Sequence, residues 1–556
     1  MSQTFESDQE FSVRAIAGTY VVQLAMNLPE AECAGLRGFA IHRTDYTEGE
    51  AYWLSGMKTF AETDPGFPPG SRHSTREHPI QDFLWGDYSA KPGHTYTYRV
   101  LALKGPPADL QPYRAVDVTI ETESPEGGDH DVYFNRGATA TQEYARRFGN
   151  RRPGSQGGEA DPAWTWLSRG AFEAMRDFVG RALDGDWGLR VSAYEFRQPA
   201  IVKAFREAAD RGADVRILYD AGKDFPRDDN RQAAADAGVA GLCIERVPSP
   251  AALSHNKFMV LLQHGRPVAV LTGSTNISDG GIFGQSNVVH VVEDPDVAAA
   301  YLACWQQLAT NPKKKTLAPA LTAGFPLPPD SSAGVTPIFS PRDSLDALDH
   351  YAQLAAGATD ALFMTFAFGM HEFFAEAYRT GTAFLRYALF ETALGPGVRK
   401  EKRAEAFADF VALRKMPENR FAVGSHISIN HLDRWLAEEL TGLNTHVKYV
   451  HTKYMLVDPL GPDPIVVTGS ANFSAASTNK NDENMLIIRG NRRVAEIYLG
   501  EYLRLWEHYA FREWLGSKKK PSGAVQEPWH LDSTDAWWQR HFGNTPLSHR
   551  REYFGT

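Results

Sequence analysis

The chain reads His255-Asn256-Lys257-Phe258-Met259-Val260 and, after a short interval, Gly273-Ser274-Thr275-Asn276-Ile277-Ser278. Farther along it reads His451-Thr452-Lys453-Tyr454-Met455-Leu456 and then Gly469-Ser470-Ala471-Asn472-Phe473-Ser474. In both copies, 21 positions separate the histidine from the asparagine. A single His-x-Lys carries little information, but two copies with matched spacing and matched Gly-Ser-x-Asn indicate an internal duplication.

The residue types of the repeat suit phosphoryl chemistry. On a strand, the period of two sends the histidine and the lysine of His-x-Lys to the same face. The chain then returns as a second strand, whose end brings a hydroxyl and a carboxamide to the same place. Two such sets around an approximate two-fold axis would surround a phosphodiester with cations and hydrogen-bond donors, together with a nucleophile and an acid.

The flanking sequence predicts the same α/β arrangement around each copy. In the first half, strands are expected at residues 189–196 and 215–220, with a helix at 199–211 between them. In the second half, strands are expected at 361–368 and 384–390, with a helix at 371–379. The matched tryptophans Trp305 and Trp506, each in the helix after its motif, are interpreted as core residues.

The duplicated motif resembles the paired HxK…GSxN motifs of the phospholipase D superfamily, and the resemblance covers roughly residues 130–515. It implies two α/β/α halves related by a pseudo-two-fold axis, one site at their interface, no metal or other cofactor, and a covalent phosphohistidine intermediate. One histidine attacks phosphorus and the other protonates the leaving group. The residues expected to act in catalysis are His255, His451, Lys257, Lys453, Asn276 and Asn472.

The two copies differ in their acidic residues. The family motif continues as HxKxxxxD, which the second copy keeps at Asp458, whereas the first copy has Leu262. Downstream, the second copy has Glu483 where the first copy has only Gln285 and its neighbours. By analogy with tyrosyl-DNA phosphodiesterases, Glu483 is expected to orient His255 as the nucleophile. Gln285 or Ser286 would then face His451, the general acid.

Three further residues are expected in or near the site. Ser274 and Ser470 are expected to bind substrate, the alternative being a purely structural role. Asp458 is expected to support the structure near the site rather than to transfer protons.

The N-terminal region reads as a small all-β domain. Alternating stretches at residues 20–25 and 95–103 are separated by Gly, Pro and Asp turns. The segment Lys91-Pro92-Gly93-His94-Thr95-Tyr96-Thr97-Tyr98-Arg99-Val100 resembles a late strand of fibronectin type III sandwiches. We therefore expect an accessory β-sandwich at residues 1–125.

The other expected divisions follow composition. Residues 130–310 form the first half and 337–515 the second, joined by a Pro-, Gly- and Ser-rich linker at 311–336. Residues 516–556 form a tail rich in tryptophan, including Trp529, Trp537 and Trp538, which is expected to pack on the body. The lysine runs at 313–315 and 518–520 are interpreted mainly as solvated surface.

The bulk numbers exclude some classes of protein. The 556 residues carry a net charge of −10, which argues against a chain-wide electrostatic grip on nucleic acid. Cys33, Cys243 and Cys304 lie too far apart in sequence for a zinc or disulfide framework. Neither a secretory signal nor a membrane-spanning run is apparent, so a cytoplasmic location is expected, the alternative being a secreted protein whose signal has been removed. One chain carries both motifs, so a monomer is expected to suffice for catalysis.

Three functions remain open from the sequence. The favoured hypothesis is a phosphodiesterase that cleaves the head group of a phospholipid, with or without peripheral membrane contact. The second is a nuclease on the same scaffold, because residues 204–220 resemble nuclease-like and cardiolipin-synthase-like members. The third is a catalytically dead binding or scaffold protein, which Leu262 and the missing first-half acid would suit.

Overall fold

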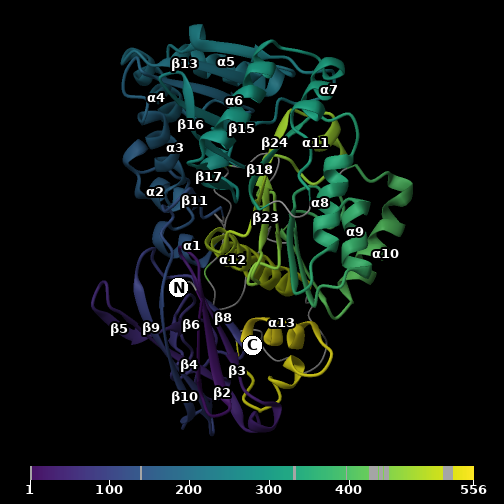
Figure 1. Cartoon of the computed structure of the whole chain (residues 1–556). Coiled ribbons are helices and arrows are strands. Elements are labelled where there is room, and N and C mark those ends of the chain that lie inside the picture. The colour runs from purple at the N-terminus through teal and green to yellow at the C-terminus, as the bar shows by residue number, and fades with distance from the viewer. Residues whose placement is uncertain are drawn as a thin grey trace.

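The computed structural model describes residues 3–137, 141–329, 333–395, 397–424, 436, 443, 450–517 and 530–556. Two seven-stranded sheets with helices on their faces lie above an all-β region that contains the N-terminus (Figure 1). Within these ranges, no helix is both long enough and apolar enough to cross a membrane.

The two large sheets have the same strand order, which is the structural form of the repeat. In each sheet, three neighbouring strands run parallel and the remaining strands are antiparallel. The first sheet runs β11 (His130–Phe134), β17 (Val288–Val292), β16 (Arg266–Gly273), β15 (Lys257–Gln263), β12 (Trp187–Ala193), β13 (Asp214–Asp220) and β14 (Cys243–Arg246). The second runs β18 (Gly334–Ser340), β24 (Glu483–Arg489), β23 (Ile465–Gly469), β22 (Tyr454–Val457), β19 (Ala361–Phe366), β20 (Leu385–Phe390) and β21 (Asn419–Val423).

Amphipathic helices cover these sheets, as the 3.6-residue periodicity predicts. In α4, the expected apolar face of Ile201, Val202, Phe205 and Ala208 is buried. The helices of the first half are α1 (Gln142–Phe148), α2 (Pro162–Ser168), α3 (Ala171–Gly180), α4 (Pro199–Asp210), α5 (Asp224–Asp236) and α6 (Pro295–Ala309). Those that follow are α7 (Lys314–Gly324), α8 (Asp346–Ala356), α9 (Glu372–Thr380), α10 (Arg403–Arg414), α11 (Ala475–Asn479), α12 (Arg492–Ser517) and α13 (Pro546–Gly555).

The two halves share one core. Helices α6 and α12 lie between the sheets, and Trp305 and Trp506 are both buried in the same apolar cluster. The indole of Trp305 also donates to the carbonyl of Val191, 2.8 Å away. Both tryptophans are therefore core residues, and the halves are held as a unit that can keep a shared site rigid.

The expected linker is largely regular structure. Helix α7 occupies Lys314–Gly324 and β18 begins at Gly334, so the segment at 311–336 that joins the halves contains a helix and the start of a strand. The reason is that Leu317, Ala318 and Leu321 form a buried apolar stripe, which outweighs the Pro and Gly content around it. Of the lysine run at 313–315, Lys313 and Lys315 are exposed, while 518–520 lie outside the described residues.

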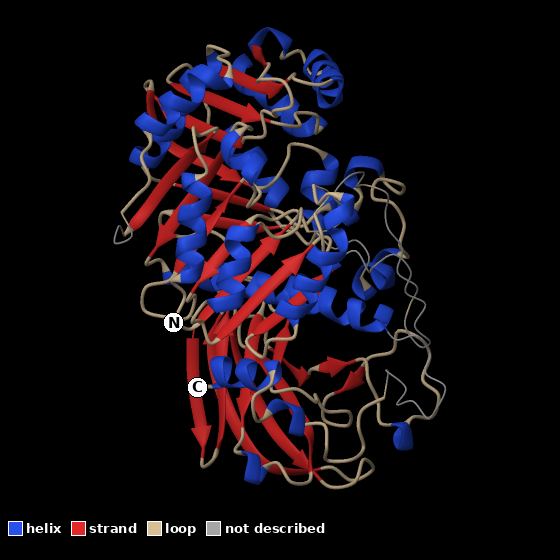
Figure 2. Cartoon of the chain, turned by 90° about the vertical axis from the view of Figure 1, so that its right-hand side faces the viewer, coloured by secondary structure: helices blue, strands red, loops and turns tan. Residues whose placement is uncertain are grey.

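The N-terminal region forms two facing four-stranded sheets around a common core. The C-terminal segment packs on it: Trp537 is buried in that core and donates to the carbonyl of Leu36 at 2.9 Å. Helix α13 lies beside this region near the C-terminus (Figure 2). Trp529 lies outside the described residues. The strands are β1 (Gln3–Asp8), β2 (Phe11–Ala17), β3 (Val22–Asn27), β8 (Leu84–Asp87), β10 (Gln111–Glu121), β9 (Thr95–Lys104), β4 (Leu36–Asp45) and β5 (Glu50–Trp53), with a separate pair β6 (Ser55–Gly56) and β7 (His73–Ser74).

Candidate functional site

The two histidines meet where the halves join. Each one precedes the first residues of a central strand, β15 or β22, and its neighbourhood pairs with the opposite half. Ser254 forms a parallel bridge with Asp482, and Val450 forms the corresponding bridge with Ser286. The same 196 positions separate Ser254 from Val450 and Ser286 from Asp482, so the two bridges are related by the repeat. Reciprocal pairing across the interface therefore builds one site from both copies.

His255 is held by the carboxylate expected from the sequence. Its Nδ1 lies 2.8 Å from Oε2 of Glu483, and both side chains are buried. Burial raises the pKa of Glu483 to about 7, although Lys257 opposes that shift. A carboxylate on Nδ1 fixes the ring orientation and the tautomer. Nε2 of His255 is then the nitrogen left for a substrate.

His451 is held by an amide, but not by the one expected. Its Nδ1 lies 2.8 Å from Oδ1 of Asn287. Gln285 instead contributes its backbone carbonyl to Asn135, and Ser286 Oγ accepts from the backbone N–H of His451. The ring nitrogen of His451 is thus held by Asn287, and not by Gln285 or Ser286 as expected, while Ser286 contacts only the backbone of His451 among the hydrogen bonds described.

Spacing from the serine would have found Asn287. Asn287 follows Ser274 by 13 positions, and Glu483 follows Ser470 by the same 13. The amide Nδ2 of Asn287 donates to the carbonyl of Gly281 at 2.8 Å, which turns Oδ1 toward His451. Nδ1 of His451 must therefore carry the proton, and Nε2 is again the free nitrogen.

The two serines hold these orienting groups rather than the substrate. Ser470 Oγ donates to Glu483 Oε2, and Ser274 Oγ donates to Asn287 Oδ1, each at 2.8 Å. Ser470 Oγ also accepts from the backbone N–H of Asn484, and Ser274 Oγ accepts from the backbone N–H of Val288. Both serines are fully buried. The expected substrate-binding role of Ser274 and Ser470 is replaced by a positioning role, because their hydrogen-bonding capacity is used within the protein.

The two lysines are buried beside the histidines. Nζ of Lys257 donates to the carbonyl of His255 at 2.7 Å, and Lys453 makes the same contact with His451. Burial lowers the pKa of Lys257 to about 8 and, together with the charge of Lys257, holds the pKa of Lys453 well below its usual range. In their protonated forms, both lysines would attract a phosphate, and a bound phosphate would in turn favour their protonation.

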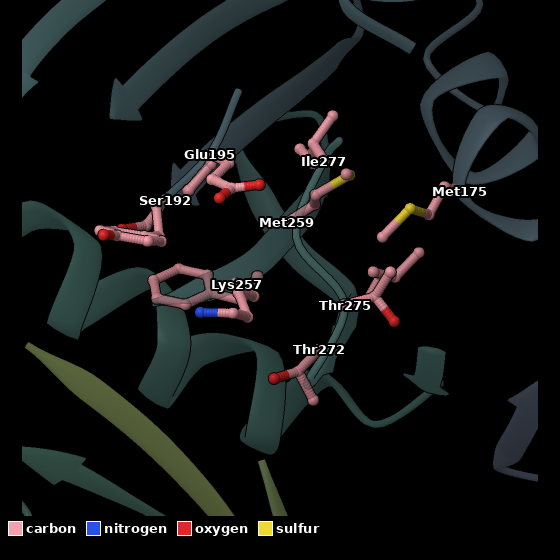
Figure 3. Close-up of a pocket in the computed structure, with 12 residues that line it drawn as sticks. Met175, Ser192, Glu195, Lys257, Met259, Thr272, Thr275 and Ile277 are labelled. Carbon is pink, nitrogen blue, oxygen red and sulfur yellow. The ribbon is translucent and has the colours of Figure 1, made fainter. Parts of the chain in front are cut away.

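Tyr194, which the sequence reasoning missed, lies beside the histidine and the lysine of the first half. The ring of Tyr194 lies 5.0 Å from that of His255, and Nζ of Lys257 is 5.4 Å from the Tyr194 ring centre. Lys257 also borders a small internal cavity with Ser192 and Glu195 (Figure 3). The local signal was the position of Tyr194 directly after a strand that pairs with the motif.

Each asparagine of the repeat has a buried side-chain oxygen. Oδ1 of Asn276 and Oδ1 of Asn472 are both buried and accept no hydrogen bond from the described residues. Buried polar atoms are normally paired. These two acceptors therefore suit a hydroxyl or an ordered water at an occupied site, in line with the site role expected for both residues.

A comparison with known families agrees with this geometry. Residues 188–308 and 422–506, which include both motif copies, match the family model described as "Cardiolipin synthase, PLD-like domain". The chain carries a phospholipase D-like domain. The resemblance seen in the paired motifs is thus confirmed, while the likeness of the N-terminal region to fibronectin type III is supported only by its β structure.

Individual relatives match over limited parts. Mitochondrial cardiolipin hydrolase of Xenopus tropicalis is 38% identical over 61 residues, 11% of this chain and 27% of that protein. The chain thus matches about a quarter of that relative's length. Phosphatidylserine synthase of Haemophilus influenzae Rd KW20 aligns at 10% identity and TM-score 0.43 over 61% of this chain and 84% of that one. The phospholipase D family member Nuc of Salmonella typhimurium aligns at 27% identity and TM-score 0.21 over 24% and 87%.

Each half of the phospholipase D-like domain also fixes its histidine through an acid at the end of a parallel strand. Asp220 is the last residue of β13 and accepts from the backbone N–H of Ser254 at 2.7 Å. Glu391 directly follows β20 and accepts from Val450 at 2.9 Å. Burial raises the pKa of Asp220 to about 6. Both acids were missed by the sequence reasoning, although an acid at the carboxyl end of a buried parallel strand is a usable signal.

The electrostatics of the site are set by burial. Burial lowers the pKa of His255 and of His451 well below the usual range, and the two lysines lower both further. Burial thereby favours neutral imidazoles, and a bound anion would offset the lysine charges. Among the described residues, no group of three or more His, Cys, Asp or Glu side chains is arranged to hold a metal ion.

Asp458 lies at the far end of its strand from His451. Its carboxylate accepts from the backbone N–H groups of Thr359, Asp360 and Ala361 at 2.8 to 3.2 Å. It therefore supports the start of β19 and not, as expected, the surroundings of the site. The equivalent Leu262 is buried in the shared core. Loss of this aspartate from the first copy leaves the contacts of His255 intact.

Replacing Asp458 with alanine is expected to lower the free energy of unfolding by roughly 1 to 2 kcal/mol, because several backbone donors lose their acceptor. The turnover rate should stay within about twofold, since no contact of either histidine changes. Thermal unfolding and a steady-state assay measure the two quantities. Asp463→Ala in the same loop controls for the loss of an acid, and a large fall in kcat with Asp458→Ala alone would contradict the structural role.

Proposed function

We propose that this protein is a phosphodiesterase of the phospholipase D type that cleaves phospholipid head groups through a covalent phosphohistidine. The observation that carries the proposal is the pair of buried His-x-Lys motifs. Nδ1 of His255 is held by Glu483, and Nδ1 of His451 is held by Asn287. This arrangement leaves two Nε2 atoms and two ammonium groups for a single phosphodiester. An intact set of this kind also argues against a catalytically dead scaffold.

The chemistry divides between the two histidines. Nε2 of His255, supported by Glu483, attacks phosphorus while the bond from phosphorus to the head-group oxygen breaks. The departing oxygen takes a proton from His451, which must be protonated at Nε2 when substrate is bound. Lys257 and Lys453 offset the charge of the non-bridging oxygens, where phosphoryl transfer needs stabilisation.

The second step reverses these roles at His451. Its neutral Nε2 now takes a proton from water, and the hydroxyl oxygen forms a bond to phosphorus as the bond to His255 breaks. A primary alcohol in place of water would give a transferred phosphatidyl group. Because imidazoles and ammonium groups supply the acid, base and charge, we expect both steps to proceed without a divalent metal.

A lipid substrate is supported by the loops at the carboxyl ends of the parallel strands, the same edge as the site. Phe225 follows β13, Val247 follows β14 and Phe368 follows β19, and all three are exposed. Exposed apolar side chains at this edge favour contact with another apolar surface. The net charge of −10 also suits a lipid better than a polyanionic nucleic acid.

The test offers phosphatidylcholine vesicles and a primary alcohol to the purified protein in the presence of EDTA. Phosphatidyl-alcohol is expected from the wild type and from His264→Asn, which replaces an exposed histidine in the turn between β15 and β16. His255→Ala should give none.

Absence of product from folded wild-type protein would overturn the lipid proposal. Release of nucleotides from single- or double-stranded DNA by the same sample, lost in His255→Ala, would assign a nuclease instead. Inactivity on both substrates would favour a binding role.

A further inference from the structure

A buried ion pair ties the two halves together directly behind His255. The guanidinium of Arg246, at the end of β14, binds both carboxylate oxygens of Asp482, with Nε–Oδ2 and Nη2–Oδ1 distances of 2.9 and 3.2 Å. Both side chains are about 1% exposed. Nη1 of Arg246 also donates to Oδ1 of Asn311 and to the carbonyl of Pro312, in the segment between the halves.

The backbone of Asp482 carries this fixation to the site. Its carbonyl accepts from the N–H of His255 at 2.9 Å, and its own N–H donates to Leu253 at 2.9 Å. The next residue in the chain is Glu483, the acceptor for Nδ1 of His255. Arg246 therefore holds a segment that touches the backbone and the ring of the same histidine.

On the His451 side, the two positions equivalent to Arg246 and Asp482 carry no charge. Asp482 corresponds through the repeat to Ser286, whose hydroxyl accepts from the N–H of His451. In the first sheet, Arg246 pairs with Asp220. In the second sheet, the last pair is Phe390 with Val423, so the next residue, Gly424, takes the position equivalent to Arg246, opposite Glu391. Within the described part of the chain, the Arg246–Asp482 pair is therefore not repeated at the equivalent positions Gly424 and Ser286, and it lies on the side of the histidine that also has the carboxylate.

We propose that Arg246 and Asp482 are positioning residues that hold His255 and Glu483 in their reactive arrangement. The inference deepens the proposed function, and the role of His255 as nucleophile rests on it. Buried pairs add little net stability compared with apolar replacements of similar size, whereas a single broken pair leaves an uncompensated charge. A role in positioning accounts for retaining two buried charges at this one side of the interface.

The test compares Arg246→Met/Asp482→Asn, which removes both charges together, with Arg246→Lys and with Arg386→Met. Arg386 is a buried arginine near the start of β20, and its guanidinium donates a hydrogen bond to Asn419. This variant controls for the loss of a buried guanidinium. Circular dichroism and thermal unfolding establish that each variant is folded. The double variant is expected to lower kcat by about 10- to 100-fold with KM within about twofold, as loosened supporting contacts do. Arg246→Lys should recover part of the loss.

A second measurement does not depend on turnover. Diethyl pyrocarbonate acylates imidazole nitrogen, and peptide mass spectrometry gives the rate at each histidine. In the double variant, the rate at His255 is expected to rise at least about threefold as the ring is released, while His451 and the Arg386→Met protein stay at wild-type rates.

A folded double variant with wild-type kcat and an unchanged rate at His255 would overturn the proposal, and so would equal changes at His255 and His451. If the wild type turns over no phosphodiester, the proposed function fails. The acylation rates then still decide whether Arg246 and Asp482 position His255.

Discussion

His255→Ala is expected to lower kcat by about 10⁴-fold or more, because it removes the atom that forms the covalent bond to phosphorus. His451→Ala should depend on the leaving group. A lipid alkoxide needs a proton and should leave about 10²- to 10⁴-fold more slowly, whereas 4-nitrophenolate leaves without one. With bis(4-nitrophenyl) phosphate, His451→Ala should release one equivalent of nitrophenolate in a burst.

The histidine that carries the phosphoryl group in the covalent intermediate is the nucleophile. Rapid quenching of the His451→Ala reaction, followed by peptide mapping under alkaline conditions, should place the phosphoryl group on His255. Slow hydrolysis should let it accumulate, because no base remains to activate water. Phosphate found on His451 of the wild type, or a burst from His255→Ala, would reverse the assignment. His264→Asn again serves as the exposed-histidine control.

Glu483→Gln should have the second largest effect, a fall in kcat of about 10²- to 10⁴-fold, because the imidazole loses the charge that supports it as a nucleophile. The amide is geometrically tolerated at this place, as Asn287 demonstrates opposite His451. Loss of rate would therefore report charge and not shape. Ser470→Ala, which removes a single hydrogen bond to Glu483, should cost far less.

The pH dependence gives Glu483 a separate signature. Its pKa is raised to about 7, so the wild-type rate should fall as pH drops through that value and the carboxylate takes up a proton. Glu483→Gln should lack this acid limb. The folded-state pKa lies above the ordinary 4.5, so ionised Glu483 costs stability as pH rises from about 4.5 to 7.

Stability completes that test. Glu483→Gln should not lower the Tm at pH 8, because the buried charge is absent from the variant. A Gln variant with a rate within about threefold of wild type and an unchanged acid limb would show that the carboxylate is dispensable.

The sequence alone predicts the parts of this molecule that repeat locally. Matched His-x-Lys and Gly-Ser-x-Asn segments identified both halves, because chemistry at a two-fold site requires the same residues twice. Periods of 2 and 3.6 placed β12, α4 and β13 within a few residues, because alternation and helical spacing follow from how side chains leave the backbone. Glu483 was identified through the resemblance to the phospholipase D superfamily, which places an acid downstream of the second motif copy.

Tertiary structure alone decided which groups touch. Asn287 reaches His451, whereas Asp220 and Glu391 bind the backbone of the residues just before the two histidines. Arg246 meets Asp482 from a position 236 residues away. Ser274 and Ser470 looked like ligands because a hydroxyl in a turn carries no sign of its partner. Asp458 looked close to its histidine in the motif but lies at the opposite end of the strand. Local pattern records which way a side chain points, whereas burial and pairing between distant segments determine what it meets.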